Sequence, residues 1–390
     1  NDRRANRSKS VVSAVTSQAP ARADLAALSR ELERQYPAPH ELRLEFGGCV
    51  MLVLSNSEEL LASLREYFGD LVQPGAGHTA DAAHVRIRAL EAAPPDFDHA
   101  FREWPREAGK AGQKEQFFDL SDGRVVFKVR TRMQFLLGRS DLVAVGPCLT
   151  NSNQIINFIN SQCISQRLHE GWSLCHASGV ARPSPLGARG IGIAARAGAG
   201  KSTLALHLMS SGLCFVSNDR LLIKDTGHGA EMAGIPKMPR VNPGTLLNNP
   251  DLHGILPAAR QQELAQLSRE QIWNLEEKYD VLVDQVYGKG RTLYRASLAG
   301  LLILNWSWAD SCAPTRFEVV ELDARRDLLD LVMKSPGVFH RDPAGQSAAD
   351  TTRPEPARYL EAVRHTRVWE ATGRPQFELG VSFCRGLLEV

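Results

Sequence analysis

A glycine-rich run that ends in a lysine and a hydroxyl residue is typical of loops that bind phosphate groups. Residues 195–203 read Ala-Arg-Ala-Gly-Ala-Gly-Lys-Ser-Thr. An apolar strand predicted over 191–194 precedes this run, and a helix predicted from Lys201 follows it, which is the context that a Walker A motif requires. Small residues let consecutive backbone N–H groups turn inward, and the helix N-terminus adds a partial positive charge. The run therefore predicts a nucleotide phosphate site.

Each residue type in the run has a role in that chemistry. Lys201 can reach the β- and γ-phosphates of ATP, and the Ser202 hydroxyl can ligate Mg²⁺. The first motif position is Ala195 where the pattern has glycine, so Gly198 is expected to supply the special dihedral. The alternative is an incidental Gly-Lys-Ser at a strand–turn–helix joint. The predicted ATP and phosphate contacts are Arg196, Ala197, Gly198, Ala199, Gly200, Lys201, Ser202 and Thr203.

An acidic residue follows the next apolar run. Residues 213–216 predict a strand, and Ser217, Asn218 and Asp219 come directly after it. A carboxylate at the end of the strand after the loop helix belongs near the phosphates, where it can hold Mg²⁺ or accept a hydroxyl proton. Asp219 could instead merely begin a turn. Because Arg220 and no glutamate follows it, hydrolysis of ATP is the less favoured task.

Two further residues are weaker candidates. His176 precedes Lys201 by 25 residues, in a strand predicted over 172–180 that leads toward the loop strand. If the two strands are adjacent, His176 lies near the phosphates, although spacing alone favours a core histidine. Arg240 lies in a Pro- and Asn-rich loop that also holds Lys237, and a guanidinium suits bidentate phosphate contact. The alternative for Arg240 is a solvated loop.

Composition excludes several classes of protein. The chain has 46 Lys+Arg against 44 Asp+Glu, a formal net charge of +2, which argues against a nucleic-acid binder. Its 7 cysteines are scattered without a C-x-x-C pair, so no zinc or redox motif is present, and reduced thiols are expected. No signal peptide is visible, and no apolar run approaches the ~20 residues that span a bilayer. We therefore expect a cytoplasmic protein without a membrane or nucleic-acid partner.

The pattern of elements predicts an α/β protein in two parts after a flexible leader. Strands, the glycine-rich loop and helices alternate in the second part, as in a sheet with crossover helices. The predicted divisions are residues 1–22 for the leader, 23–165 for an α+β N-terminal domain and 166–390 for the P-loop domain. In the N-terminal part, helices are expected over 23–36, 58–68 and 154–168, and strands over 42–46, 49–54, 84–88, 116–120 and 124–129.

Together these motifs resemble the C-terminal domain of the HPr serine kinase/phosphorylase family. The resemblance rests on three runs: His176 to Gly179, Gly198 to Ser202, and Val216 to Asp219. The chain is most similar to the set called HprK-related kinase B, through the runs 146–160 and 171–179. The resemblance implies a fold akin to phosphoenolpyruvate carboxykinase, use of ATP and Mg²⁺, and self-assembly, since HPr kinases form hexamers.

The same resemblance implies roles for several site residues and leaves the reverse reaction open. It implies that Asp219 is the base that takes the acceptor proton, that His176 acts near the phosphates, and that Lys201 and Ser202 carry over directly. Asn218 replaces the first Asp of the family pair, and the loop over 236–244 has no acid where the family has a metal-binding Glu. The phosphorylase signature is not recognisable, so the reverse reaction is left open.

Three functions fit these residues. The leading hypothesis is a kinase that transfers the γ-phosphoryl group of ATP to a hydroxyl, either a serine of a small protein or a small-molecule alcohol. The N-terminal part does not resemble that of HPr kinases, so the acceptor stays unidentified. A catalytically weakened ATP-binding sensor and a simple ATPase are the alternatives.

Overall fold

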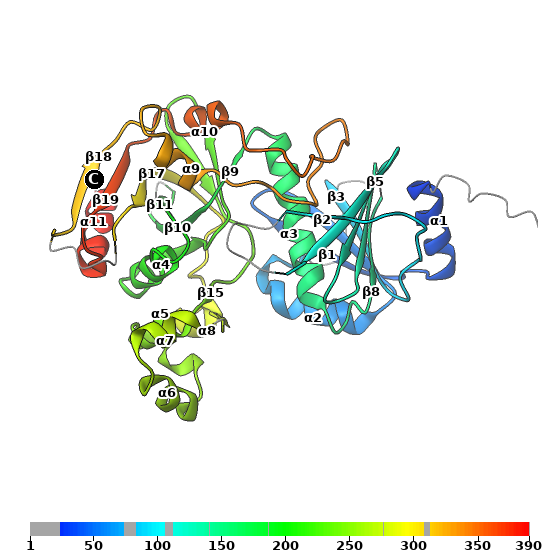
Figure 1. The fold of residues 1–390 in the computed structure, drawn as a ribbon, viewed down its shortest axis with the longest axis horizontal. Helices are drawn as coiled ribbons and strands as arrows, with labels where there is room; N and C mark the ends of the chain where they lie inside the picture. The colour runs from blue at the N-terminus through cyan, green and yellow to red at the C-terminus, as the bar shows by residue number, and fades with distance from the viewer. Residues whose placement is uncertain are drawn as a thin grey trace, which may run out of the picture.

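A computed structural model describes residues 24–73, 83–105, 112–139, 141–185, 187–275, 277–307 and 313–389. Figure 1 shows two lobes, each built around a β-sheet, with a smaller helical unit beside the second sheet. The predicted leader over 1–22 lies outside the described residues. In the ranges given above, no helix is long and apolar enough to cross a membrane.

The first sheet has eight strands in the order β1-β2-β3-β8-β7-β6-β5-β4. Helices α2 (Glu58–Phe68) and α3 (Ser152–His169) cover one face, and α1 (Leu25–Gln35) covers the other. The predicted helices and strands of this part are confirmed. The strands are β1 (His40–Phe46), β2 (Cys49–Ser55), β3 (Val85–Glu91), β4 (Arg102–Glu103), β5 (Glu115–Leu120), β6 (Gly123–Lys128), β7 (Gln134–Gly138) and β8 (Leu142–Gly146).

The second sheet has nine strands and mixed directions, so the chain is a mixed α/β protein. Its main path is β12-β10-β11-β17-β14-β13-β9, and β19 pairs with β17 and β18. Helix α4 (Lys201–Ser210) crosses from β11 to β12, which lies beyond β10 in the sheet. The strands are β9 (Ser173–Cys175), β10 (Ala177–Arg182), β11 (Arg189–Ala195), β12 (Cys214–Ser217), β13 (Leu221–Asp225), β14 (Ala230–Ala233), β17 (Arg295–Leu304), β18 (Arg316–Val319) and β19 (Val368–Thr372).

Helices bury both faces of this sheet, which explains why its central strand, β11, has no polar side chain after Arg189. Along β11, Ile191 and Ile193 face α4 (Lys201–Ser210) and α11 (Phe377–Glu389), whereas Ala194 belongs to the core beneath α9 (Arg326–Val332) and α10 (Pro356–Val363). Strand side chains alternate between the two faces of a sheet, so a strand covered on both sides must be apolar at every position.

The helical unit is inserted between β14 and β17 and packs on α4. Its apolar side chains Leu246, Leu252 and Leu264 are fully buried in the same core as Leu206 of α4. The unit consists of β15 (Arg240–Val241), α5 (Pro243–Leu247), the 3₁₀-helix η3 (Pro250–Ile255), α6 (Ala258–Ala265), α7 (Arg269–Asn274), β16 (Tyr279–Asp280) and α8 (Val283–Tyr287).

One segment, residues 334–341, runs from the second sheet into the core of the first, and we call it the strap. Val338 and Phe339 are buried in the core of the first sheet, where the Phe339 ring lies 5.0 Å from the Phe135 ring and 5.1 Å from the Phe158 ring. The Arg124 guanidinium donates a hydrogen bond to the Val338 carbonyl (3.3 Å). The predicted boundary at residue 165 falls within α3, and the division into domains stays a prediction.

Truncation of the strap anchor tests how firmly the two lobes are joined. Phe339→Ala is expected to lower the free energy of unfolding by about 3–5 kcal/mol, because it leaves a cavity among buried aromatic rings. Urea denaturation measures this loss. The control is Val319→Ala on β18, where the side chain is 58% exposed and the change should stay within about 0.5 kcal/mol. Equal effects of the two substitutions would contradict the packing role of the strap.

Candidate active site

The glycine-rich loop, residues 196–200, connects the end of β11 to the start of α4. The strand and helix predicted on either side of it are confirmed. Gly198 and Gly200 have φ angles of +82° and +94°, a region that favours glycine. The Ala199 N–H donates to the Arg196 carbonyl (3.1 Å), which closes the turn. Ala195 is still in the strand and has no left-handed φ, so a methyl group is tolerated there.

Two aromatic residues hold the loop from the side of α11. The Trp306 indole donates to the Ala199 carbonyl (2.6 Å), and its ring meets the Phe377 ring edge-on at 5.4 Å. A Cβ atom at Gly200 would lie 2.7 Å from Cζ of Phe377. Position 200 therefore requires glycine for two independent reasons, its backbone dihedral and the close approach of this ring.

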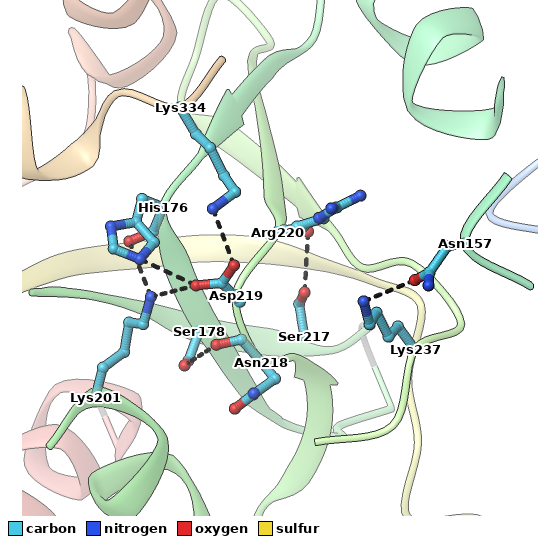
Figure 2. Close-up of polar contacts among 10 residues, drawn as sticks. All are labelled: Asn157, His176, Ser178, Lys201, Ser217, Asn218, Asp219, Arg220, Lys237 and Lys334. Atoms are coloured by element: carbon cyan, nitrogen blue, oxygen red, sulfur yellow. Dashed lines mark hydrogen bonds and ion pairs between the residues drawn. The ribbon is translucent and has the colours of Figure 1, made fainter. Parts of the chain in front are cut away.

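Three cationic or ionisable side chains converge on the Asp219 carboxylate (Figure 2). Lys201 Nζ lies 2.8 Å from Oδ1, and Lys334 Nζ lies 2.9 Å from Oδ2. His176 Nε2 lies 3.0 Å from the same Oδ1 as Lys201. We call these four residues the Asp219 centre. They come from four separate segments: the first residue of α4, the break between β9 and β10, the turn after β12, and the strap.

The local backbone explains how His176 and Asp219 reach this point. Strand β10 pairs with β11, with Ala177 opposite Ala194, so the two strands are adjacent and the condition for placing His176 near the loop is met. The strand expected over 172–180 is interrupted at His176, whose N–H donates to the Val332 carbonyl (2.8 Å). The Ser178 hydroxyl donates to the Asn218 carbonyl and thereby fixes the turn that carries Asp219.

The surrounding charges keep Asp219 ionised, and its side chain is accessible to solvent. Burial opposes its ionisation, but the hydrogen bond from His176 and the charges of Lys201 and Lys334 outweigh burial, so the pKa of Asp219 lies below its ordinary value. The Asp219 side chain is 44% exposed, whereas that of Lys201 is only 9% exposed. The centre thus offers an ionised carboxylate to solvent, backed by a buried ammonium group.

Some predicted residues lie elsewhere or have other partners. Arg240 is exposed on β15 and pairs with Asp280 (2.9 Å) instead of with the Asp219 centre. The Thr203 hydroxyl lies 2.9 Å from the Thr245 hydroxyl of α5. Ser202 is the second residue of α4, one position after Lys201.

Lys334 is the residue of the centre that the sequence did not single out. It follows the apolar helix α9 without a recognisable motif. The pairing of Cys175 with Met333 and the hydrogen bond of the Lys334 N–H to the Tyr359 hydroxyl (3.3 Å) help to place it beside Asp219. No local signal in the sequence could have identified it.

A dedicated metal cage is absent from the described part of the chain, where no group of three or more His, Cys, Asp and Glu residues is placed to hold an ion. This is compatible with Mg²⁺ bound together with a nucleotide, because Mg²⁺ then takes one or two protein oxygens and completes its shell with phosphates and water. Ser202 and Asp219 remain the predicted ligands.

Gly200→Ala tests the fit of the loop against the aromatic pair. Gly212 provides a matched control, since it also has a left-handed φ (+108°) but nothing within 4 Å of its added Cβ. Gly212→Ala should destabilise the fold by about 1–2 kcal/mol through backbone strain alone. Gly200→Ala should lower the melting temperature further, because Phe377 must also move. Identical melting temperatures would show that Phe377 does not press on the loop.

Comparison with known proteins gives only a distant likeness. No family model matches the chain, and no curated protein matches it. Among solved structures, the HPr(Ser) kinase/phosphatase from Coxiella burnetii is similar over 54% of this chain and 87% of that chain, with 10% sequence identity and a TM-score of 0.26. A TM-score this low does not indicate a shared function. The function of this protein must therefore be inferred from the geometry of the site.

Proposed function

We propose that this protein is an ATP-dependent, Mg²⁺-requiring kinase of the HPr kinase/phosphorylase type, related to the HprK-related kinase B set, which phosphorylates a hydroxyl group. The observation that carries the proposal is the 2.8 Å contact between Lys201, at the helix end of the glycine-rich loop, and Asp219, at the end of a strand of the same sheet. This contact joins a phosphate-binding element to a carboxylate that can accept a proton.

The loop supplies the phosphate site. The backbone N–H groups of residues 196–203 and the N-terminus of α4 favour anionic oxygens, and Lys201 adds a full positive charge. Arg196 is exposed at the mouth of the loop, where its guanidinium can reach a phosphate from solvent. When bound at Ser202 and Asp219, Mg²⁺ would neutralise charge on the transferred phosphoryl group.

The Lys201 ammonium cannot keep its 2.8 Å contact with Asp219 and also bind a nucleotide phosphate equally well. In the structure it lowers the pKa of Asp219 together with His176 and Lys334, and a carboxylate with a lowered pKa is a weak base. A bound phosphate would draw the Lys201 ammonium away from Oδ1. The pKa of Asp219 would then rise and strengthen the base, while His176 and Lys334 hold its position for the acceptor hydroxyl.

A kinase fits better than the two alternatives. An ATPase requires a group that activates water, and Arg220 instead of a second acid follows Asp219. A sensor without transfer would need no base, whereas Asp219 is ionised and 44% exposed. Self-assembly and a cytoplasmic location belong to the same proposal; the six cysteines within the described ranges are free and buried, as suits a reducing compartment.

Lys201→Ala tests the phosphate site. Removal of its charge should lower phosphoryl transfer by about 10²–10³-fold and weaken ATP binding, because no other residue of α4 replaces the ammonium. His176 and Lys334 still hold Asp219, so the melting temperature should stay close to that of the wild type. Lys289→Ala, an exposed lysine after α8, is the control. Full transfer by a folded Lys201→Ala protein would overturn the assignment.

Asp219→Asn tests the base. The substitution keeps the shape of the side chain but removes its basicity, so ATP binding should persist while transfer falls by about 10²–10⁴-fold. Labelled ATP and a cell extract give the readout. Label on an acceptor supports the kinase, release of free phosphate without an acceptor indicates the ATPase, and binding without either reaction indicates the sensor. Undiminished transfer by Asp219→Asn would exclude it as the base.

A further inference from the structure

A further lysine, Lys237, lies near the Asp219 centre and outside the phosphate loop (Figure 2). Its Nζ donates to Oδ1 of Asn157 on α3 (2.9 Å), which is a neutral partner. Among the described residues, no carboxylate lies within ion-pair distance of this ammonium. A partly buried charge without a counter-ion is unfavourable, and such groups are frequently functional.

The position of Lys237 is fixed by the first lobe. Three consecutive residues of its loop are held by side chains of α2 and α3. Asn160 donates to the Pro236 carbonyl (3.2 Å), Asn157 accepts from Lys237, and the Met238 N–H donates to the Tyr67 hydroxyl (3.3 Å). Since Asn160 is fully buried, this is a built arrangement and not a solvated loop.

The charges around Lys237 are mainly positive. Arg220, Lys114 and Arg240 repel its ammonium, and Asp219 attracts it. Burial, followed by these like charges, lowers the pKa of Lys237 to about 8. Lys114 and Arg240 each have a carboxylate partner, Glu115 and Asp280, at 3.7 Å and 2.9 Å. Since the ammonium of Lys237 has the neutral Asn157 as its hydrogen-bond partner, an anion placed beside it would relieve an uncompensated positive charge.

We propose that Lys237 binds an anionic group of the phosphoryl acceptor, a carboxylate or phosphate on the same small molecule as the accepting hydroxyl. This proposal rests on the proposed kinase function. A small molecule is favoured because the anion site and the base interact electrostatically, so one compact ligand can span them.

The transfer step then balances as follows. The acceptor oxygen forms a bond to the γ-phosphorus of ATP, and the bond from that phosphorus to the bridging oxygen breaks. ADP leaves with the electron pair, and the hydroxyl proton passes to a carboxylate oxygen of Asp219. Lys237 takes no part in these bond changes; it positions the acceptor through the anionic group.

Binding of inorganic phosphate tests the anion site without any need for catalysis. The full chain is first saturated with Mg²⁺ and a non-hydrolysable ATP analogue, which fills the phosphate loop, and phosphate is then titrated and followed by phosphorus NMR. Lys237→Met should weaken this second binding event by at least about tenfold, as expected for a lost charged hydrogen bond, and Lys237→Arg should restore it. Lys289→Met is the matched control. Equal phosphate binding by the wild type and Lys237→Met, or no second event in the wild type, would overturn the proposal.

Matched alcohols test the acceptor. Labelled ATP is supplied with glycerol, glycerate or glycerol 3-phosphate, and the wild type is expected to phosphorylate a charged alcohol in preference to glycerol. Lys237→Met should raise KM for that acceptor at least about tenfold and leave KM for ATP unchanged. Because the Lys237 ammonium is charged below its pKa of about 8 and neutral above it, the acceptor KM of the wild type should rise above pH 8. In Lys237→Arg that rise should disappear.

The two proposals can fail separately. In one outcome, the wild type transfers phosphate to glycerol as efficiently as to the charged alcohols, with no effect of Lys237→Met. That result would refute the anion site and leave the proposed kinase function intact. Phosphate binding that depends on Lys237, without transfer to any alcohol or extract component, would refute the kinase and leave the anion site. Transfer to a protein of the extract and to none of the small molecules would refute the small-molecule acceptor.

Discussion

The ion pair between Lys201 and Asp219 is the interaction on which the arrangement of the candidate site depends. The Lys201 side chain is only 9% exposed, and a buried ammonium requires a nearby anion to remain charged. Asp219 supplies that anion from the far side of β10, so the loop helix, the turn after β12 and the break at His176 must all meet at one point. Small residues make this approach feasible, most clearly Gly200 beneath the Phe377 ring.

The first lobe contributes to the same point by two routes. The strap carries Lys334 at one end and Phe339 at the other, so packing in the core of the first sheet positions a cation of the Asp219 centre. Helices α2 and α3 hold the loop of Lys237 through Tyr67, Asn157 and Asn160. The first lobe, in which the sequence reveals no chemistry, thus supports the side of the site where we place the acceptor.

Local sequence patterns predicted the helices and strands well. Contacts between residues far apart in the sequence could not be predicted. Helix α2 has the predicted bounds, and the glycine-rich loop lies between the strand and helix expected for it, because periodicity and glycine placement are local properties. Lys334 could not be predicted, since its contact with Asp219 depends on how α9 packs over the sheet. In the loop over 236–244, composition alone did not distinguish Lys237 from Arg240. The difference arises from their partners, Asn157 and Asp280, which lie far away in the sequence.

The central claim is that Lys201 leaves Asp219 when a nucleotide arrives and thereby activates the base. The most direct test is a carbon NMR titration of the Asp219 carboxyl, assigned with Asp219→Asn, in the presence and absence of a non-hydrolysable ATP analogue. Mg²⁺ is left out of both samples, because an ion bound at Asp219 would itself lower the pKa. The account predicts a pKa below the ordinary aspartate value in the free protein and a higher pKa in the complex. An unchanged or lower pKa in the complex would contradict it.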